Sequence, residues 1–131
     1  MGGEIEISVA LPDRGLCGNG KAKGPWRTRL VAEQRRAAYL AGRMRVAPGE
    51  VWFPSGRVLV NVLVKRDPLW GRKKLDDDNF IRGLKATMDG LTDAGLVTND
   101  SQFRWGDIEW EGADPYQGEV LLTLTPVEKG E

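Results

Sequence analysis

The sequence predicts a single α/β domain that spans residues 1–131, with a mixed β-sheet and two principal helices in the order β-α-β-β-α-β-β. Three observations support this prediction. Polar and apolar residues alternate near the N-terminus, two longer segments have helical periodicity, and apolar runs bounded by turn residues follow each of those segments. A chain of 131 residues is long enough to bury one hydrophobic core.

The first third of the chain predicts a strand, a loop and a helix. Residues 4–11 alternate polar and apolar side chains and predict a half-buried strand that ends at Pro12. Residues 13–25 are rich in Gly, Lys and Pro and predict an exposed loop. Residues 26–42 predict a helix with arginines on one side. Its apolar stripe would consist of Leu30, Ala37, Ala38 and Ala41.

The middle of the chain predicts a β-hairpin. Residues 51–53 and 58–64 are apolar runs, and the segment 54–57, Pro-Ser-Gly-Arg, has the chemistry of a turn between them. The second run is nearly continuous in apolar residues, which is typical of a central strand covered on both faces.

A second helix is expected to begin near Asp78 and to stop at Gly95, a residue suited to a helix C-terminus. Its apolar face would consist of Phe80, Leu84, Met88 and Leu91. The opposite face carries Asp78, Arg82, Lys85 and Asp89, for which an exposed ladder of ion pairs is the simplest interpretation. Residues 102–110 and 119–125 predict the last two strands.

Two residue counts restrict the chemistry. The chain has no histidine and a single cysteine, Cys17. Histidine-based triads and HExxH zinc sites are therefore excluded, and any metal site must use oxygen ligands, which favours Mg²⁺, Mn²⁺ or Ca²⁺. A lone cysteine forms no internal disulfide, no apolar run approaches the ~20 residues of a membrane span, and the N-terminus lacks signal-peptide order. We therefore expect a cytoplasmic protein.

Charge is distributed unevenly although the formal net charge is zero. Basic residues gather between residues 14 and 45 and again between 57 and 74, and the acidic residues follow them. This asymmetry permits a basic surface beside an acidic pocket, although an ordinary solvated surface explains it equally well.

The segment 76–78 consists of three consecutive aspartates at a predicted helix start. Capping explains one of them, and the mutual repulsion of three predicts a cation as partner. In an extended approach to the helix, Asp76 and Asp78 would point the same way and share the cation, whereas Asp77 would be a solvated or capping acid. Asn79 would be the partner at the helix start, and Lys85 would lie near the azimuth of Asp78.

The acidic segment has two other interpretations. An EF-hand requires glycine at the sixth loop position and glutamate at the twelfth, where this chain has Ile81 and Thr87. That interpretation therefore fails. A solvated turn without a ligand remains an alternative.

Short motifs over residues 75–102 carry a family resemblance: Asp76-x-Asp78-Asn79, Lys85-x-x-x-Asp89-x-Leu91, Ala94-Gly95 and Asp100-x-Gln102. This pattern resembles the RusA family of Holliday-junction resolvases, in its phage-type form, and the likeness is looser over the first strand and residues 19–26. The resemblance implies a magnesium-dependent endodeoxyribonuclease of DNA recombination and repair, with Mn²⁺ as a chemical equivalent. It also implies that Asp76, Asp78 and Asp100 are catalytic metal ligands and that Lys85 is the essential lysine.

Two positions depart from the family pattern. The family's lysine follows the Asp-Asn pair by three residues, whereas Lys85 follows Asn79 by six and Arg82 occupies the shorter spacing. The downstream motif favours Lys85, and Arg82 remains the alternative. The usual pair of aspartates is Asn99-Asp100 in this chain, which keeps the acid assigned to catalysis.

The predicted helix creates a problem of reach for Asp100. Residues 79–94 would span about 24 Å as a helix, and the five residues that follow can return at most ~17 Å. Asp100 is therefore not expected to reach Asp76 and Asp78 of its own chain. We expect a homodimer in which the active sites are shared between subunits.

The expected partner is branched DNA, recognised by backbone charge and shape. The candidate DNA contacts are Lys21, Lys23, Arg27, Arg35, Arg72, Lys73, Lys74 and Arg82. The five tryptophans could stack on unpaired bases, although core or interface packing explains most of them. Two alternatives stay open: a nuclease acting on flaps or replication forks, and a catalytically silent DNA-binding protein of the same fold.

Overall fold

The structure is a computed structural model that describes residues 2–18, 20–70 and 75–127. It is a single α/β domain with a four-stranded mixed sheet in the spatial order β1-β4-β2-β3. The strands are β1 (Ile5–Val9), β2 (Val58–Arg66), β3 (Phe103–Gly112) and β4 (Glu119–Pro126). The strand β2 runs parallel to β3, and β4 is antiparallel to both β1 and β2. The predicted fold class is therefore confirmed.

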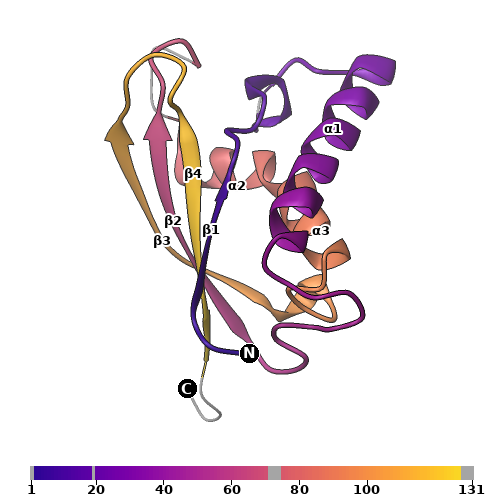
Figure 1. The fold of residues 1–131 in the computed structure, drawn as a ribbon. Helices are drawn as coiled ribbons and strands as arrows, with labels where there is room; N and C mark the ends of the chain where they lie inside the picture. Colours follow the sequence, from indigo (N-terminus) through magenta and orange to yellow (C-terminus); the bar gives the residue numbers. More distant parts are fainter. Residues whose placement is uncertain (1, 19, 71–74, 128–131) are drawn as a thin grey trace.

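The helices pack on one face of this sheet (Figure 1). They are α1 (Gly24–Arg43), α2 (Asp77–Gly83) and α3 (Lys85–Asp93), with short 3-10 turns η1 (Arg14–Leu16) and η2 (Asp100–Gln102). The helix face of β2 presents the buried side chains Val58, Val60, Val62 and Val64. Residues on its other face are only half-buried, so the prediction of cover on both faces was wrong although β2 is central.

The predicted hairpin does not form. Residues 51–53 make no ladder with β2. Instead Phe53 forms an isolated parallel bridge with Val97, and its N–H donates to the carbonyl of Leu96 at 2.9 Å. The reason is that both edges of β2 are already occupied, by β4 and by β3.

The first helix begins at Gly24, two residues earlier than predicted, with a proline in its first turn. It crosses α3 at close range through glycines. A Cβ at Gly90 would collide with the carbonyl of Arg35, and one at Gly42 would lie 2.6 Å from the Cβ of Ala94. Of the predicted apolar stripe, Ala38 is buried, Leu30 and Ala41 are half-buried, and Ala37 is exposed.

The predicted second helix is divided into α2 and α3 at Leu84, whose dihedrals are φ −88° and ψ 0°. The N–H of Leu84 bonds the carbonyl of Ile81, three residues back, at 2.9 Å. The glycine before it, Gly83, lies directly against the Sγ of Cys17. The break at Leu84 is therefore accompanied by a contact between two segments that lie far apart in the sequence. The predicted apolar face is confirmed, because its four side chains are all buried: Phe80, Leu84, Met88 and Leu91.

The helical segment ends where the sequence predicted. Gly95 has a φ of +96°, in the left-handed region that favours glycine. The N–H of Gly95 bonds the carbonyl of Thr92 at 3.0 Å, and the N–H of Leu96 bonds the carbonyl of Leu91 at 3.1 Å. This pair of bonds is a Schellman motif, and the fully buried Leu91 and Leu96 supply its apolar contact.

Candidate functional site

The acidic segment forms the start of α2. Asp76 takes the N-cap position with extended dihedrals, φ −60° and ψ 147°, and its side chain makes no capping hydrogen bond. Asp77 and Asp78 belong to the first helical turn, and all three side chains are exposed. The extended approach predicted for this segment therefore ends at Asp76, because Asp77 and Asp78 already belong to the helix. The sharing of one cation by Asp76 and Asp78 stays a prediction.

The neighbours of this segment also differ from expectation. Asp77 is not a cap. Its Oδ1 accepts a hydrogen bond from the indole Nε1 of Trp110 at 3.1 Å. Asn79 is the third residue of α2 rather than its start, and its side chain lies directly against Gly18. The acidic segment is thus held between the sheet on one side and the η1 loop (residues 13–18 and 20–23) on the other.

An aromatic cluster packs α2 against the sheet. The ring of Phe80 lies 5.9 Å from that of Trp70 and 5.0 Å from that of Trp110, edge-on in both cases. The guanidinium of Arg14 lies 4.6 Å from the centre of the Trp70 ring, a cation–π contact. This packing fixes the position of α2 on the sheet.

Lys85, the first residue of α3, joins two acids. Its Nζ lies 2.9 Å from Oδ1 of Asp89 and 3.5 Å from Oδ2 of Asp100. The hydrogen bond to Asp89 raises the pKa of the Lys85 ammonium, and the charge of Asp100 raises it further. The ladder predicted on this helix face is confirmed for Lys85 and Asp89. Two of the four predicted catalytic residues, Lys85 and Asp100, come together.

Asp100 is held by its neighbours in η2. The side chain of Asn99 caps this turn. The Oε1 of Gln102 accepts from two backbone N–H groups of the same corner, and its Nε2 donates to the carbonyls of Phe53 at 3.1 Å and Gly56 at 3.0 Å. Gln102 therefore fixes the Asp100 corner against the 53–56 segment.

A cavity of about 230 Å³ adjoins this corner and is lined by Asp89, Asp93, Asp100 and Arg35 among others. Arg35 makes a bidentate ion pair with Asp93, at 2.6 Å and 2.9 Å, which ties α1 to α3. The Arg35 guanidinium lowers the pKa of Asp93. A predicted DNA contact, Arg35, thus already has an acidic partner.

The predicted metal ligands do not form one cluster within the chain. Among residues 2–18, 20–70 and 75–127, no group of three or more acidic, cysteine or histidine side chains could hold one metal ion together. Asp100 contacts Lys85, whereas Asp76 and Asp78 lie at the far end of α2. The argument that Lys85 shares the azimuth of Asp78 was wrong, because the break at Leu84 interrupts the helix between them.

Four of the other basic candidates lie on the surface. Lys21, Lys23, Arg27 and Arg82 are exposed. Arg72, Lys73 and Lys74 lie outside the residues that the structure describes. Of the tryptophans, Trp26 is 46% exposed and Trp105 is 36% exposed. Three others pack partly buried against the core: Trp52, Trp70 and Trp110.

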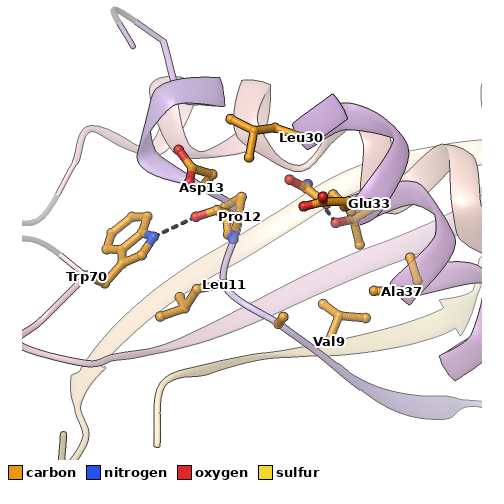
Figure 2. A pocket seen from close by; sticks show the side chains of 12 residues that line it. Val9, Leu11, Pro12, Asp13, Leu30, Glu33, Ala37 and Trp70 are labelled. Atoms are coloured by element: carbon orange, nitrogen blue, oxygen red, sulfur yellow. Dashed lines mark hydrogen bonds between the residues drawn. The ribbon is translucent and has the colours of Figure 1, made fainter. Parts of the chain in front are cut away.

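A larger cavity, of about 390 Å³, lies between the end of β1 and the side of α1 (Figure 2). The indole of Trp70 borders it and donates to the carbonyl of Pro12 at 2.6 Å. Gln34, also in its wall, donates to the carbonyl of Gly83 at 2.6 Å and to Oγ1 of Thr87 at 2.9 Å. None of the predicted site residues that the structure describes lines this cavity. The two hydrogen bonds of Gln34 instead tie α1 to the junction of α2 and α3.

The ion pair of Lys85 with Asp89 was predicted from their spacing of four residues in a helix. Gln102 was predicted only as part of a motif, and its contacts were not. The roles of Gln102 and Arg14 had no local signal, because each depends on a segment far away in the sequence.

Comparison with protein-family models gives no match for this chain, and comparison with curated proteins gives none. Within the described residues, no helix combines the length and apolar character needed to cross a membrane.

Proposed function

We propose that this protein is a magnesium-dependent, structure-specific endodeoxyribonuclease that resolves four-way DNA junctions by symmetric paired nicks. We place its work in the cytoplasm of a bacterial or phage-infected cell. The motif pattern over residues 75–102 is the basis of the proposal. The observation that carries it furthest is the 3.5 Å approach of Lys85 Nζ to Asp100 Oδ2. These two motif residues are separated by a helix and a turn, and the fold brings their functional groups together.

The donor set fits the proposed metal. The candidate ligands Asp76, Asp78 and Asp100 are exposed carboxylates, and hard oxygen donors are what Mg²⁺ binds. When bound, Mg²⁺ would lower the pKa of a water and neutralise phosphate charge. Asp76 and Asp78 would hold it beside the start of α2.

Lys85 would stabilise the charge that develops on the phosphate during hydrolysis. Its ammonium is protonated at neutral pH, as in any ordinary lysine, and the hydrogen bond to Asp89 raises its pKa further. It is also accessible, with 71% of the side chain exposed, so a phosphate can approach it. Arg82, exposed on α2, is the alternative for this role.

A shared active site follows if Asp100 acts on the same phosphate as Asp76. Within one chain Asp100 lies 3.5 Å from Lys85, and the described residues contain no group of three carboxylates that could hold one metal ion. A homodimer related by a two-fold axis could bring Asp100 and Lys85 of one subunit to Asp76 and Asp78 of the other. Two such sites could nick two opposed strands.

The test is cleavage of a synthetic four-way junction with Mg²⁺. We expect symmetric paired nicks from the wild type, none from Asp78→Asn, and full activity from Asp114→Asn, an exposed acid outside the site. Nicks at flaps or forks instead would favour the broader nuclease activity. Tight binding by the wild type without any cleavage would favour a silent DNA-binding protein and overturn the proposed reaction.

A further inference from the structure

A cavity of about 460 Å³ opens beside the start of α2, between the η1 loop and the first turn of α1. Its lining contains both apolar and polar side chains. The apolar ones are Cys17, Trp26 and Leu75. The polar ones are Arg14, Lys21 and Asn79.

The cavity adjoins the acidic segment. Leu75 and Asn79, which line it, are the residues that bracket Asp76–Asp78 in the chain. Two close contacts hold the η1 loop against α2: Gly18 lies directly against Asn79, and Gly83 lies directly against the Sγ of Cys17. The loop that carries Lys21 is therefore placed beside the proposed metal ligands.

The lining has the chemistry of a nucleotide site. Trp26 is 46% exposed although it is the largest side chain type, and it lines the cavity, so part of its indole is accessible to a ligand. Lys21 supplies an exposed ammonium for a phosphate, and the amide of Asn79 can both donate and accept hydrogen bonds. A simple anion would not need the indole, and an apolar ligand would not need the ammonium. A base with its phosphate uses both.

We propose that this cavity binds one unstacked nucleotide of the DNA, with its base against Trp26 and its phosphate near Lys21. The inference rests on the proposed function, and it adds a site next to the cleaved bond that accepts an unpaired base. Such a site would favour branched DNA, because bases are most easily unstacked where strands exchange. Stacking tolerates any base, since every base has a π-face.

The test is binding of a short single-stranded oligonucleotide, measured by fluorescence anisotropy in the Asp78→Asn background so that no cleavage occurs. We expect Trp26→Ala to weaken binding by about 5- to 150-fold, the range for loss of one stacked base. Trp26→Phe should recover most of the affinity. Trp105→Ala, which removes a similarly exposed indole from β3, should have no effect. Equal thermal melting of the variants excludes unfolding as the cause.

A second measurement locates the base. Abasic nucleotides are placed in turn around the exchange point of a four-way junction. At one position the loss from Trp26→Ala should disappear, because the partner of the indole is already missing. Unchanged oligonucleotide binding by Trp26→Ala would overturn the cavity assignment, as would an equal loss on every abasic junction. Trp26-dependent binding of single strands without junction cleavage would keep the nucleotide site and reject the resolvase reaction.

Discussion

Replacing Gln102 by leucine tests how the Asp100 corner is held. The Oε1 of Gln102 accepts from the N–H groups of Thr98 at 2.9 Å and Asn99 at 3.0 Å. Its Nε2 donates to the carbonyls of Phe53 at 3.1 Å and Gly56 at 3.0 Å. Leucine has a similar size and keeps none of these bonds. Gln102→Glu is the matched control, since it keeps the oxygen that accepts from the two N–H groups and loses the Nε2 that donates to the two carbonyls.

The expected cost follows from the four bonds. Each hydrogen bond contributes about 0.5–1.5 kcal/mol, which gives roughly 2–6 kcal/mol for the set. Most of these bonds lie in an exposed part of the chain, where water can replace the lost partner, so we expect the low end, about 2 kcal/mol. In a domain of this size that loss lowers Tm by roughly 6–10 °C. Gln102→Glu should also lower the free energy of unfolding, because its second carboxylate oxygen would face the carbonyls of Phe53 and Gly56, to which it cannot donate.

Urea unfolding gives the free energy, and junction cleavage under native conditions gives the functional effect. We expect Gln102→Leu to lower kcat more than it raises KM, because Asp100 would lose its fixed approach to Lys85. A leucine variant whose free energy of unfolding lies within about 0.5 kcal/mol of the wild-type value, and whose kcat is unchanged, would refute the reasoning.

The remaining predictions concern single contacts. Gly90→Ala should lower the free energy of unfolding by about 1–3 kcal/mol despite the better helix propensity of alanine, because the added Cβ meets the α1 backbone. A free energy of unfolding in urea equal to or above that of the wild type would contradict this. Lys85→Met should abolish cleavage in a folded protein and Arg82→Met should reduce it less; the reverse order would assign the essential cation to Arg82. The pKa of Asp93 is lowered by Arg35, so the stability from this pair is present above the ordinary aspartate pKa of ~3.9 and is lost as the pH falls through the lowered value. An Asp93 carboxyl that titrates at the ordinary value by NMR would exclude the pair.

Local chemistry was enough to predict several elements. The end of α3 at Gly95 follows from a glycine after an apolar periodic segment, and its positive φ agrees. The pair Lys85–Asp89 follows from helical spacing alone. The break at Leu84 could not be predicted in the same way, because the apolar period continues through it. It coincides with a contact between Gly83 and Cys17, which are far apart in the sequence.

The errors have a common physical origin. Turn residues at 54–57 were recognised, but the strand expected before them bonds Gly95 and Leu96 instead of β2. Which edge a segment joins depends on the whole sheet, and here β3 and β4 had taken both edges of β2. The approach of Asp100 to Lys85 is likewise non-local, since it requires the corner that Gln102 holds. The motif includes Lys85, Asp100 and Gln102, but it did not predict how they are arranged in space.

The most direct measurement of the central claim is junction cleavage by mixed subunits. Asp76→Asn and Asp100→Asn are purified separately and then mixed, with Mg²⁺ and a synthetic four-way junction. If each site takes Asp76 from one subunit and Asp100 from the other, each variant alone is inactive and the mixture regains nicking at about a quarter of all sites. An inactive mixture beside an active wild type would contradict the shared site, and a wild type that leaves the junction intact would contradict the nuclease itself.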